Sequence, residues 1–400
     1  MPYDFNRVIE RRFGSGTHSF KWEGYEDCFP GFQIDTSQAL SMWVADMDFE
    51  TLPEVKEALA QRIEHGIYGY PSESNNDAFR SAAIAWFERR WGWSECQRDW
   101  MLFCPGVVPA LYASVQAFTE PGDGVIVQTP VYYPFMGAIQ DSGRTLVNNR
   151  LLEEKLVYTM DYEELETLAQ DPANKLAIFC SPHNPVGRVW SREELQQAFD
   201  ICARHDVLIL CDEIHADLIM PGYRFTTAGL FDQYHDRLIL AHAASKTFNL
   251  AGLTSALVTV PNAELRMRLA NQFMLNCLSR GNTFGPLAGA AAYRTGDAYV
   301  DELTTYIAGN MDHACAWLAE HLPQVQVAPL QGTYLVWMDF RGLGLEEEEL
   351  YHRVIEEAGI VGDLGRWFGP GGEGFMRFNF ATPRANIDEF LIRLQVLQRV

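Results

Sequence analysis

Two stretches of the sequence decide the fold: Leu208-Ile-Leu-Cys-Asp-Glu-Ile-His215 and Ala244-Ser-Lys-Thr-Phe-Asn249. Each is associated with a short apolar run that predicts a buried strand, residues 207–210 for the first and 238–240 for the second. Asp212 and Lys246 therefore follow successive strands, thirty-four residues apart. A lysine after a strand is in most proteins a surface residue, so a functional role for Lys246 has to be supported by other residues of the chain.

The composition excludes several classes of partner. A chain of 400 residues with 48% hydrophobic content can bury a large hydrophobic core, and a chain of this length usually forms one large domain and a smaller one. The net charge of −22 disfavours nucleic acid and anionic membranes, because both are bound through Lys and Arg. No stretch approaches the roughly 20 apolar residues of a membrane span, and residues 1–7 lack the apolar run of a secretory signal. We expect a cytoplasmic protein with no nucleic-acid or membrane partner.

The cysteines and histidines predict no metal. The eight cysteines are scattered without C-x-x-C pairs, and several lie in apolar runs, as Cys180 and Cys211 do. This pattern indicates reduced core residues and not disulfides or a zinc site. The ten histidines show no H-x-x-x-H or H-E-x-x-H spacing, so we expect no catalytic metal.

The middle of the chain alternates strand-like and helix-like segments. The predicted strands are residues 100–104, 124–128, 176–180, 207–210, 238–241 and 254–260, and the predicted helices are 108–118, 132–140 and 191–205. This alternation predicts βα units, and hence an α/β fold with a mostly parallel sheet covered by helices.

The pattern changes near residue 285. A long helical stretch, 286–321, is followed by strand-like runs at 332–339 and 374–380 with a helix between them, which predicts a smaller α+β domain. The first 45 or so residues fit neither pattern and are expected to wrap onto one of the two domains. We assign residues 49–285 to the large domain, and residues 1–48 and 286–400 to the small one.

Further candidate site residues also follow predicted strands, where open α/β sheets bind their ligands. Pro105-Gly106-Val107-Val108 opens a helix, and its free backbone N–H groups can bind a phosphate. Tyr132 and Tyr133 lie at a strand exit flanked by prolines. An aromatic ring there either stacks on a cofactor ring or fills a gap in the core.

Two polar residues complete the set. Asn184 lies in the rigid turn 181–188, from which its amide can donate a hydrogen bond to a ring oxygen. Arg377 stands in the apolar strand pattern 375–380, where a buried guanidinium needs a carboxylate partner. That partner is either an internal acid or the α-carboxylate of a substrate, gripped through two parallel hydrogen bonds.

The order of these elements resembles, across nearly the whole chain, the fold-type I pyridoxal 5'-phosphate (PLP) enzymes of the aspartate aminotransferase superfamily. The separation of 28 residues between Asn184 and Asp212 is familiar there. In such enzymes an amine holds the cofactor aldehyde as a Schiff base, and a carboxylate keeps the ring nitrogen protonated. The resemblance identifies Lys246 as the Schiff-base lysine.

Narrower motifs resemble one branch, the MalY/PatB cystathionine β-lyases, which are carbon–sulfur lyases. The run Met-Trp-Val-Ala-Asp-Met-Asp-Phe (42–49) is a strong signal by itself. The others are specific together: Gly-Thr-His-Ser-Phe-Lys-Trp (16–22), Tyr68-Gly-Tyr-Pro, Pro-Gly-Val-Val, Asp-Glu-Ile-His and Ser-Lys-Thr-Phe-Asn.

The resemblance implies roles around the cofactor ring and the substrate. Asp212 would pair with the ring nitrogen, Tyr132 would stack on the ring and Asn184 would bond its 3′-oxygen. Arg377 would bind the substrate carboxylate.

The resemblance also implies how the phosphate is bound. The turn at Gly106, with the backbone amides of Val107 and Val108, would hold it. Tyr68 would reach the phosphate of the neighbouring subunit, so the active unit would be a homodimer with shared sites.

Some positions depart from the wider superfamily. Ala243 stands where many aminotransferases have a phosphate-binding serine, and Thr254 where they often have an arginine. Phosphate binding must then use the backbone turn, Tyr68 from the neighbour, and either Ser245 or Thr247. His215 stands where a tyrosine often touches the 3′-oxygen, and it either tunes the ring or only packs nearby.

The implied reaction is an α,β-elimination on a small amino-acid substrate. The free Lys246 amine takes the Cα proton, a thiolate leaves from Cβ, and hydrolysis gives pyruvate and ammonia. L-Cystathionine would give homocysteine, and another cysteine S-conjugate would give another thiol. Tyr133 or a water would protonate the leaving sulfur.

Two rival functions fit parts of the same pattern. An aminotransferase acting on an amino acid and a 2-oxo acid would use the same catalytic residues. A regulatory module that keeps the fold is disfavoured by the intact Asp212–Lys246 pair and by the acidic chain.

Overall fold

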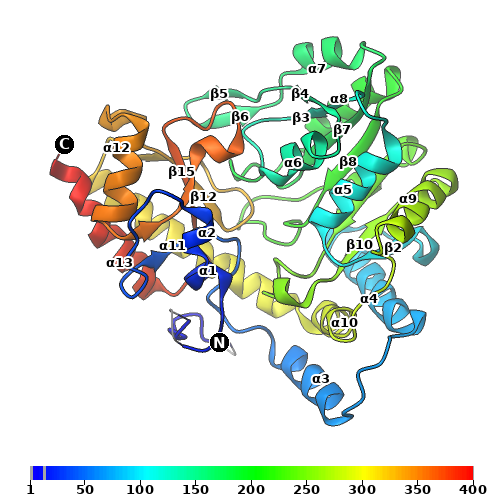
Figure 1. The fold of residues 1–400 in the computed structure, drawn as a ribbon, viewed down its shortest axis with the longest axis horizontal. Helices are drawn as coiled ribbons and strands as arrows, with labels where there is room; N and C mark the ends of the chain where they lie inside the picture. The colour runs from blue at the N-terminus through cyan, green and yellow to red at the C-terminus, as the bar shows by residue number, and fades with distance from the viewer. Residues whose placement is uncertain (1–2, 12–14, 400) are drawn as a thin grey trace.

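A seven-stranded sheet forms the centre of the larger part of the molecule (Figure 1). The computed structural model describes residues 3–11 and 15–399. The five strands from β9 to β4 are parallel, and β10 is antiparallel to both of its neighbours, which confirms the expected mostly parallel sheet. In spatial order the strands are β2 (Met101–Cys104), β10 (Ala256–Thr259), β9 (Leu238–His242), β8 (Leu208–Asp212), β7 (Asn174–Cys180), β3 (Gly124–Val127) and β4 (Thr145–Asn148).

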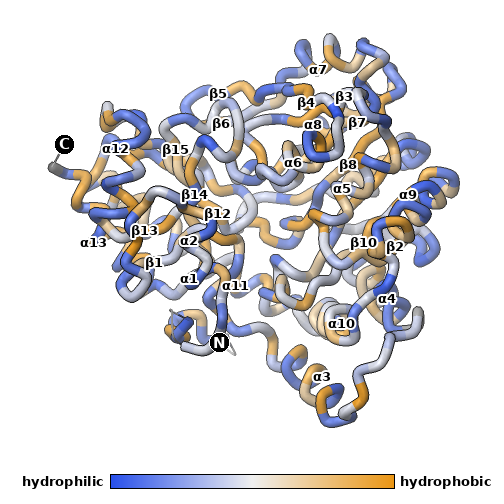
Figure 2. The backbone as a smooth tube through the Cα atoms, viewed as in Figure 1, coloured by the Kyte–Doolittle hydropathy of each residue, from blue (hydrophilic) through white to orange (hydrophobic). Residues whose placement is uncertain are grey.

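Both faces of this sheet are buried. Along β8, Ile209 and Cys211 pack in the same core as Phe199 of α8, whereas Leu210 packs in a second core with Ala113 of α5. Successive side chains of a strand point to opposite faces, so a continuous apolar run indicates helices on both sides. Figure 2 shows these central strands as largely hydrophobic, whereas outer helices such as α7 and α9 alternate between hydrophilic and hydrophobic residues.

Two sets of helices cover the two faces. The core of one face includes residues of α5, α6 and α9, and that of the other includes residues of α4, α7 and α8. Two further helices, α3 and α10, pack against each other, and α10 also packs on α4. Their bounds are α3 (Pro53–Glu64), α4 (Glu73–Trp91), α5 (Val107–Phe118), α6 (Pro134–Gln140), α7 (Tyr162–Ala169), α8 (Arg192–Arg204), α9 (Ala263–Leu275) and α10 (Gly285–Thr295).

The smaller part is built on a four-stranded antiparallel sheet, as expected for the C-terminal α+β region. Its order is β11 (Gln326–Val327), β12 (Leu335–Asp339), β15 (Phe375–Asn379) and β14 (Asp363–Leu364). The helices α11 (Asp297–His321), α12 (Glu347–His352) and α13 (Arg384–Leu394) lie around it (Figure 1).

Several details differ from the sequence-based expectations. The helix expected at 286–321 is two helices, α10 and α11, which meet at Gly296. A Cβ at Gly296 would lie 2.3 Å from the Phe248 ring, so the close approach of that ring requires glycine. Edge strand β4 and the hairpin of β5 (Leu152–Glu154) and β6 (Val157–Thr159) were not expected, because these segments are short and partly exposed.

The N-terminal segment packs on the small part, and its assignment to that domain stays a prediction. It contains α1 (Phe20–Glu23) and α2 (Tyr25–Cys28), and β1 (Leu40–Ser41) pairs in parallel with β13 (Ile360–Val361). The domain boundary at residues 285 and 286 stays a prediction, since α10 begins there and packs on α3 and α4. In the part of the chain that the structure describes, no helix has the length and apolar character of a membrane span.

A buried ion pair fixes this segment. Lys21 is fully buried, and its Nζ lies 2.7 Å from Oδ2 of Asp48. Asp48 also accepts hydrogen bonds from Nη1 of Arg11 at 2.9 Å and from Nε1 of Trp22 at 3.1 Å. A buried carboxylate needs such donors to compensate for the water it has lost.

Replacing Lys21 with Met is expected to lower the free energy of unfolding by about 3 kcal/mol, because the substitution leaves part of a buried charge uncompensated. Urea denaturation measures this change. The matched control is Lys56→Met, because Lys56 pairs with Glu50 at 3.4 Å and both side chains are about half exposed. That control is expected to cost less than about 1 kcal/mol, and equal losses in the two variants would contradict the prediction.

Candidate active site

A cavity of about 180 Å³ lies beyond the carboxyl ends of β2, β7, β8 and β9. This is the edge at which open α/β sheets bind ligands. Nine of the ten residues predicted to bind a cofactor line it: Gly106, Val107, Val108, Tyr132, Asn184, Asp212, His215, Ser245 and Lys246. The tenth, Tyr68, lies elsewhere.

Asp212 is the last residue of β8 and is 4% exposed. Its Oδ1 accepts a hydrogen bond from the Ile214 N–H at 3.0 Å. Burial raises the pKa of this carboxyl to about 7, against the opposing effects of that hydrogen bond and of Lys246. A cationic group in the cavity would therefore stabilise the carboxylate form.

Lys246 follows β9 and points toward the N-terminal segment. Its Nζ donates a hydrogen bond of 2.7 Å to the carbonyl oxygen of Ala45, which also accepts one from the Tyr334 hydroxyl at 3.0 Å. Burial lowers the pKa of the amine to about 8, although the charges of Asp46 and Asp212 raise it. At pH 7 an amine with this pKa is mostly protonated, with on the order of a tenth in the unprotonated form, far more than for an ordinary lysine.

Arg377 lies on β15, almost fully buried, and already has an internal partner. Its Nε donates to Oδ2 of Asp363 at 2.9 Å, and its Nη2 contacts the same oxygen. Its Nη1 donates to Oδ1 of Asn184 at 2.8 Å, and its Nη2 also donates to the Trp43 carbonyl oxygen at 3.2 Å. Asp363 is thus the internal acid that the sequence analysis allowed as a partner of Arg377. The binding of a substrate carboxylate by Arg377 stays a proposal.

One end of the cavity is formed by the start of α5. Gly106 precedes the helix, and no side chain in the described residues caps its first turn. The N–H groups in the first turn of a helix have no partner within the helix, so the expected binding of a phosphate by Val107 and Val108 stays a prediction. Of the two hydroxyls considered from the sequence, Ser245 lines the cavity, whereas Thr247 is buried and donates to Oδ2 of Asp217 at 3.0 Å.

The two tyrosines at the exit of β3 differ in exposure. Tyr132 lines the cavity, and its ring lies 5.1 Å from that of Tyr133. Tyr133 is 41% exposed and meets Trp367 and Phe368 edge-on, both at 6.3 Å. The pKa of the Tyr133 hydroxyl is raised by burial and by the charge of Asp363, so it is a protonated donor at neutral pH.

His215 lines the cavity on the side of Tyr334, whose ring it meets edge-on at 5.9 Å. Burial, together with the charges of Lys246 and Arg377, lowers its pKa well below the usual value. Its Nδ1 is buried and has no hydrogen-bond partner among the described residues. A neutral imidazole at the cavity wall fits both roles considered for it from the sequence.

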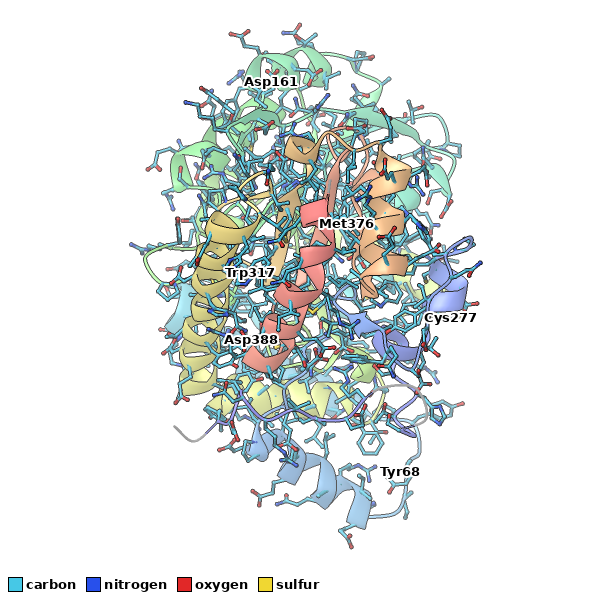
Figure 3. All side chains as sticks on the ribbon, turned by 90° about the vertical axis from the view of Figure 1, so that its left-hand side faces the viewer. Tyr68, Asp161, Cys277, Trp317, Met376 and Asp388 are labelled. Atoms are coloured by element: carbon cyan, nitrogen blue, oxygen red, sulfur yellow. The ribbon has the colours of Figure 1, made fainter. Side chains whose placement is uncertain are left out.

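Tyr68 lies on the loop after α3, at the lower edge of the molecule in Figure 3. It is 52% exposed, and its hydroxyl donates to the Ile63 carbonyl oxygen at 2.7 Å. Its ring packs at 5.6 Å from Phe284. Tyr68 is absent from the wall of the cavity described here, so its expected role requires a second subunit.

Sequence reasoning missed three residues at the site. Ala45 contributes through its carbonyl, Tyr334 through its hydroxyl to that carbonyl, and Asp363 through its pair with Arg377. The motif at residues 42–49 includes Ala45, but nothing in the sequence indicated that the Ala45 carbonyl would contact Lys246. No motif marked the other two. The described residues contain no group of three or more His, Cys, Asp or Glu side chains placed to hold a metal.

The chain belongs to the aminotransferase class I and II family, whose model matches residues 39–394. It is similar to the cystathionine beta-lyase PatB of Bacillus subtilis (strain 168), with 41% identity over 383 residues, 95% of this chain and 96% of that protein. Protein MalY of Escherichia coli (strain K12) is 30% identical over 391 residues, 97% of this chain and 96% of that protein. The structure of cystalysin from Treponema denticola, which contains a pyridoxal 5'-phosphate cofactor, matches with a TM-score of 0.94 at 36% identity, over 100% of this chain and 99% of that one. The chain therefore has the fold-type I architecture.

The lowered pKa of Lys246 predicts the pH dependence of its reaction with an aldehyde. The unprotonated amine is the nucleophile, so the rate rises as the pH rises through the pKa. With cofactor-free protein and added pyridoxal phosphate, the half-maximal rate is expected near pH 8, whereas an unperturbed lysine has a pKa of about 10.4. Stopped-flow absorbance measures the rate, with Lys246→Ala as the blank. A midpoint above pH 10 would contradict the prediction.

Proposed function

We propose that the protein is a PLP-dependent carbon–sulfur β-lyase that cleaves L-cystathionine or a related cysteine S-conjugate to a thiol, pyruvate and ammonia. The observation that carries this proposal is a buried amine with a pKa lowered to about 8, in one cavity with a buried carboxylate. The 41% identity to a cystathionine β-lyase, over 95% of the chain, supports the choice of reaction.

The residues of the cavity fit the cofactor. The carboxyl of Asp212 is buried without a full counter-charge, and a protonated ring nitrogen would supply one. Val107, Val108 and Ser245 would hold the phosphate by backbone and hydroxyl donors, and Tyr132 would lie against the ring. Asn184 would bond the 3′-oxygen. When bound, the cofactor supplies a ring that accepts electrons from the substrate Cα.

The chain supplies the proton transfers. The Lys246 amine, when free, would remove the Cα proton, because its lowered pKa gives it a larger unprotonated fraction near neutral pH than an ordinary lysine has. The Ala45 carbonyl marks where this amine rests in its free form. Breaking the Cβ–S bond releases a thiolate, and the exposed, protonated Tyr133 hydroxyl, or a water, would supply its proton.

We also propose a homodimer in which Tyr68 completes the phosphate site of the neighbouring subunit. The loop that carries Tyr68 projects from the body beside α3 (Figure 3). Ile63, Ile67 and Tyr70 are 54%, 67% and 90% exposed there. Such exposed apolar side chains in one region favour a protein partner over water.

The rival activity is an aminotransferase on the same residues, which would pass the amine to a 2-oxo acid. Purified holoenzyme is expected to form pyruvate from L-cystathionine with no 2-oxo acid added, because elimination needs only water as the second reactant. Lactate dehydrogenase coupling measures the pyruvate. Lys246→Ala is the control and should lose both the pyruvate and the visible absorption band of the lysine-bound cofactor. Consumption of a 2-oxo acid without pyruvate formation would contradict the lyase proposal.

The shared phosphate site predicts that Tyr68→Phe weakens cofactor binding. Loss of one hydrogen bond to a charged group corresponds to about a tenfold higher dissociation constant. Equilibrium dialysis of pyridoxal phosphate measures it, and gel filtration checks that the oligomer persists. Tyr70→Phe is the matched control, since it removes the same atom from a side chain that is 90% exposed. If both variants bind the cofactor like the unmodified protein, Tyr68 has no part in the site.

A further inference from the structure

Asp217 accepts three hydrogen bonds in the interior of the larger part of the molecule. It lies on the loop that follows β8, and its side chain is 6% exposed. Its Oδ1 accepts hydrogen bonds from Nε1 of Trp86 at 2.8 Å and from Nε1 of Trp91 at 3.0 Å, both on α4. Its Oδ2 accepts one from Oγ1 of Thr247 at 3.0 Å. Asp217 therefore connects α4 to the residue that directly follows Lys246.

The three residues after Lys246 are each held by a different part of the molecule. Thr247 is fully buried and held by its bond to the loop after β8. The Phe248 ring meets the ring of Trp86 edge-on at 5.6 Å. The side-chain amide of Asn249 donates to two backbone carbonyls of the N-terminal segment, both at 2.9 Å. Side-chain contacts thus fix the path of the backbone beside Lys246, and the one made by Thr247 is nearest to the lysine along the chain.

We propose that Asp217 is a positioning residue for Lys246, because through Thr247 it holds the turn from which the lysine amine reaches the Cα of a substrate. The inference rests on the proposed role of Lys246 as the base. A small displacement of a reacting group can lower the rate of a chemical step by an order of magnitude or more. The charged groups that shift the pKa of Lys246 are Asp46, Arg377 and Asp212. Asp217 therefore acts through its hydrogen bonds and not through its charge.

The test variant is Thr247→Val, which keeps the shape of the side chain and removes its hydroxyl. The matched control is Thr227→Val. Thr227 is also fully buried, and its Oγ1 donates to a buried carboxylate, Oε2 of Glu213, at 2.7 Å. Both variants leave a buried carboxylate short of one donor, so both are expected to be less stable in urea denaturation. Only Thr247 adjoins Lys246, so an effect at the lysine separates positioning from a general loss of stability.

The first measurement is amide hydrogen exchange in the cofactor-free protein, followed by mass spectrometry of its peptides. The N–H groups of Phe248 and Leu250 close the turn by hydrogen bonds of 3.0 and 2.9 Å to carbonyl oxygens earlier in it. They are expected to exchange about tenfold faster in Thr247→Val, because a segment opens more readily when a contact that holds it is lost. Thr227→Val should keep the unmodified rate. Equal protection of the turn in all three proteins would overturn the proposal, whether or not the protein is a lyase.

The second measurement is the exchange of the Cα proton of L-alanine for deuterium by the holoenzyme, followed by NMR. L-Alanine has no leaving group at Cβ, and removal of its Cα proton is common to a lyase and an aminotransferase. Thr247→Val is expected to slow the exchange about tenfold and to keep the dissociation constant of L-alanine. Thr227→Val and the conservative Thr247→Ser should stay within about twofold of the unmodified rate. An unmodified rate in Thr247→Val would refute the positioning role, and no exchange in the unmodified holoenzyme would refute the role of Lys246 as the base.

Substitutions of Asp217 itself cover the case in which Thr247→Val does not fold. Asp217→Asn keeps an acceptor for the two indole N–H groups, and its amide can donate to the Thr247 hydroxyl, so both exchange rates should be kept. Asp217→Ala removes the link, and water can reach the indoles because Asp217 lines a surface cavity of about 620 Å³. Faster amide exchange in the turn and slower Cα exchange are expected in Asp217→Ala alone. Equal rates in the Asn and Ala variants would show that Asp217 does not position Lys246.

Discussion

The parallel pairing of β8 with β9 is the constraint on which the site depends. In its register Asp212, at the carboxyl end of β8, is opposite Ala241 of β9, so the chain leaves both strands at the same edge of the sheet. Lys246 follows five residues later and lies in the same cavity as Asp212. The turn after β7 and the start of α5 after β2 reach the same edge, bringing Asn184 and the backbone amides of Val107 and Val108 to it. Because both faces of the sheet are buried under helices, this edge is where polar groups from many strands can meet.

The N-terminal segment closes the cavity on the other side, and it acts through its backbone. The carbonyls of Trp43 and Ala45 accept hydrogen bonds from Arg377 and Lys246. The side-chain amides of Asn249 and Asn379 hold this segment by its carbonyls, one from each part of the molecule. The run at 42–49 is therefore a fixed length of backbone that orients the two cationic side chains of the site.

Burial sets the electrostatics of the cavity. The pKa values of Asp212 and Asp363 are raised to about 7 and about 6, and that of Lys246 is lowered to about 8, in each case chiefly by loss of water. These shifts bring groups that titrate far apart in water close to neutral pH. Proton transfer at Cα, as proposed for Lys246, needs an amine in this range.

The sequence by itself determined the α/β class, the mostly parallel sheet and most of the cavity wall. Continuous apolar runs mark strands buried on both faces, and a polar residue directly after such a run must lie at the sheet edge, as Asp212 does. The wall residues that the sequence located follow their strands closely along the chain. Only the tertiary structure decided which hydroxyl faces the cavity, Ser245 or Thr247, and which partner Arg377 meets. Asp363 reaches Arg377 through the pairing of β14 with β15, and Ala45 reaches Lys246 from 201 residues away. Contacts of this kind depend on how distant segments pack together, and no local pattern of residues records them.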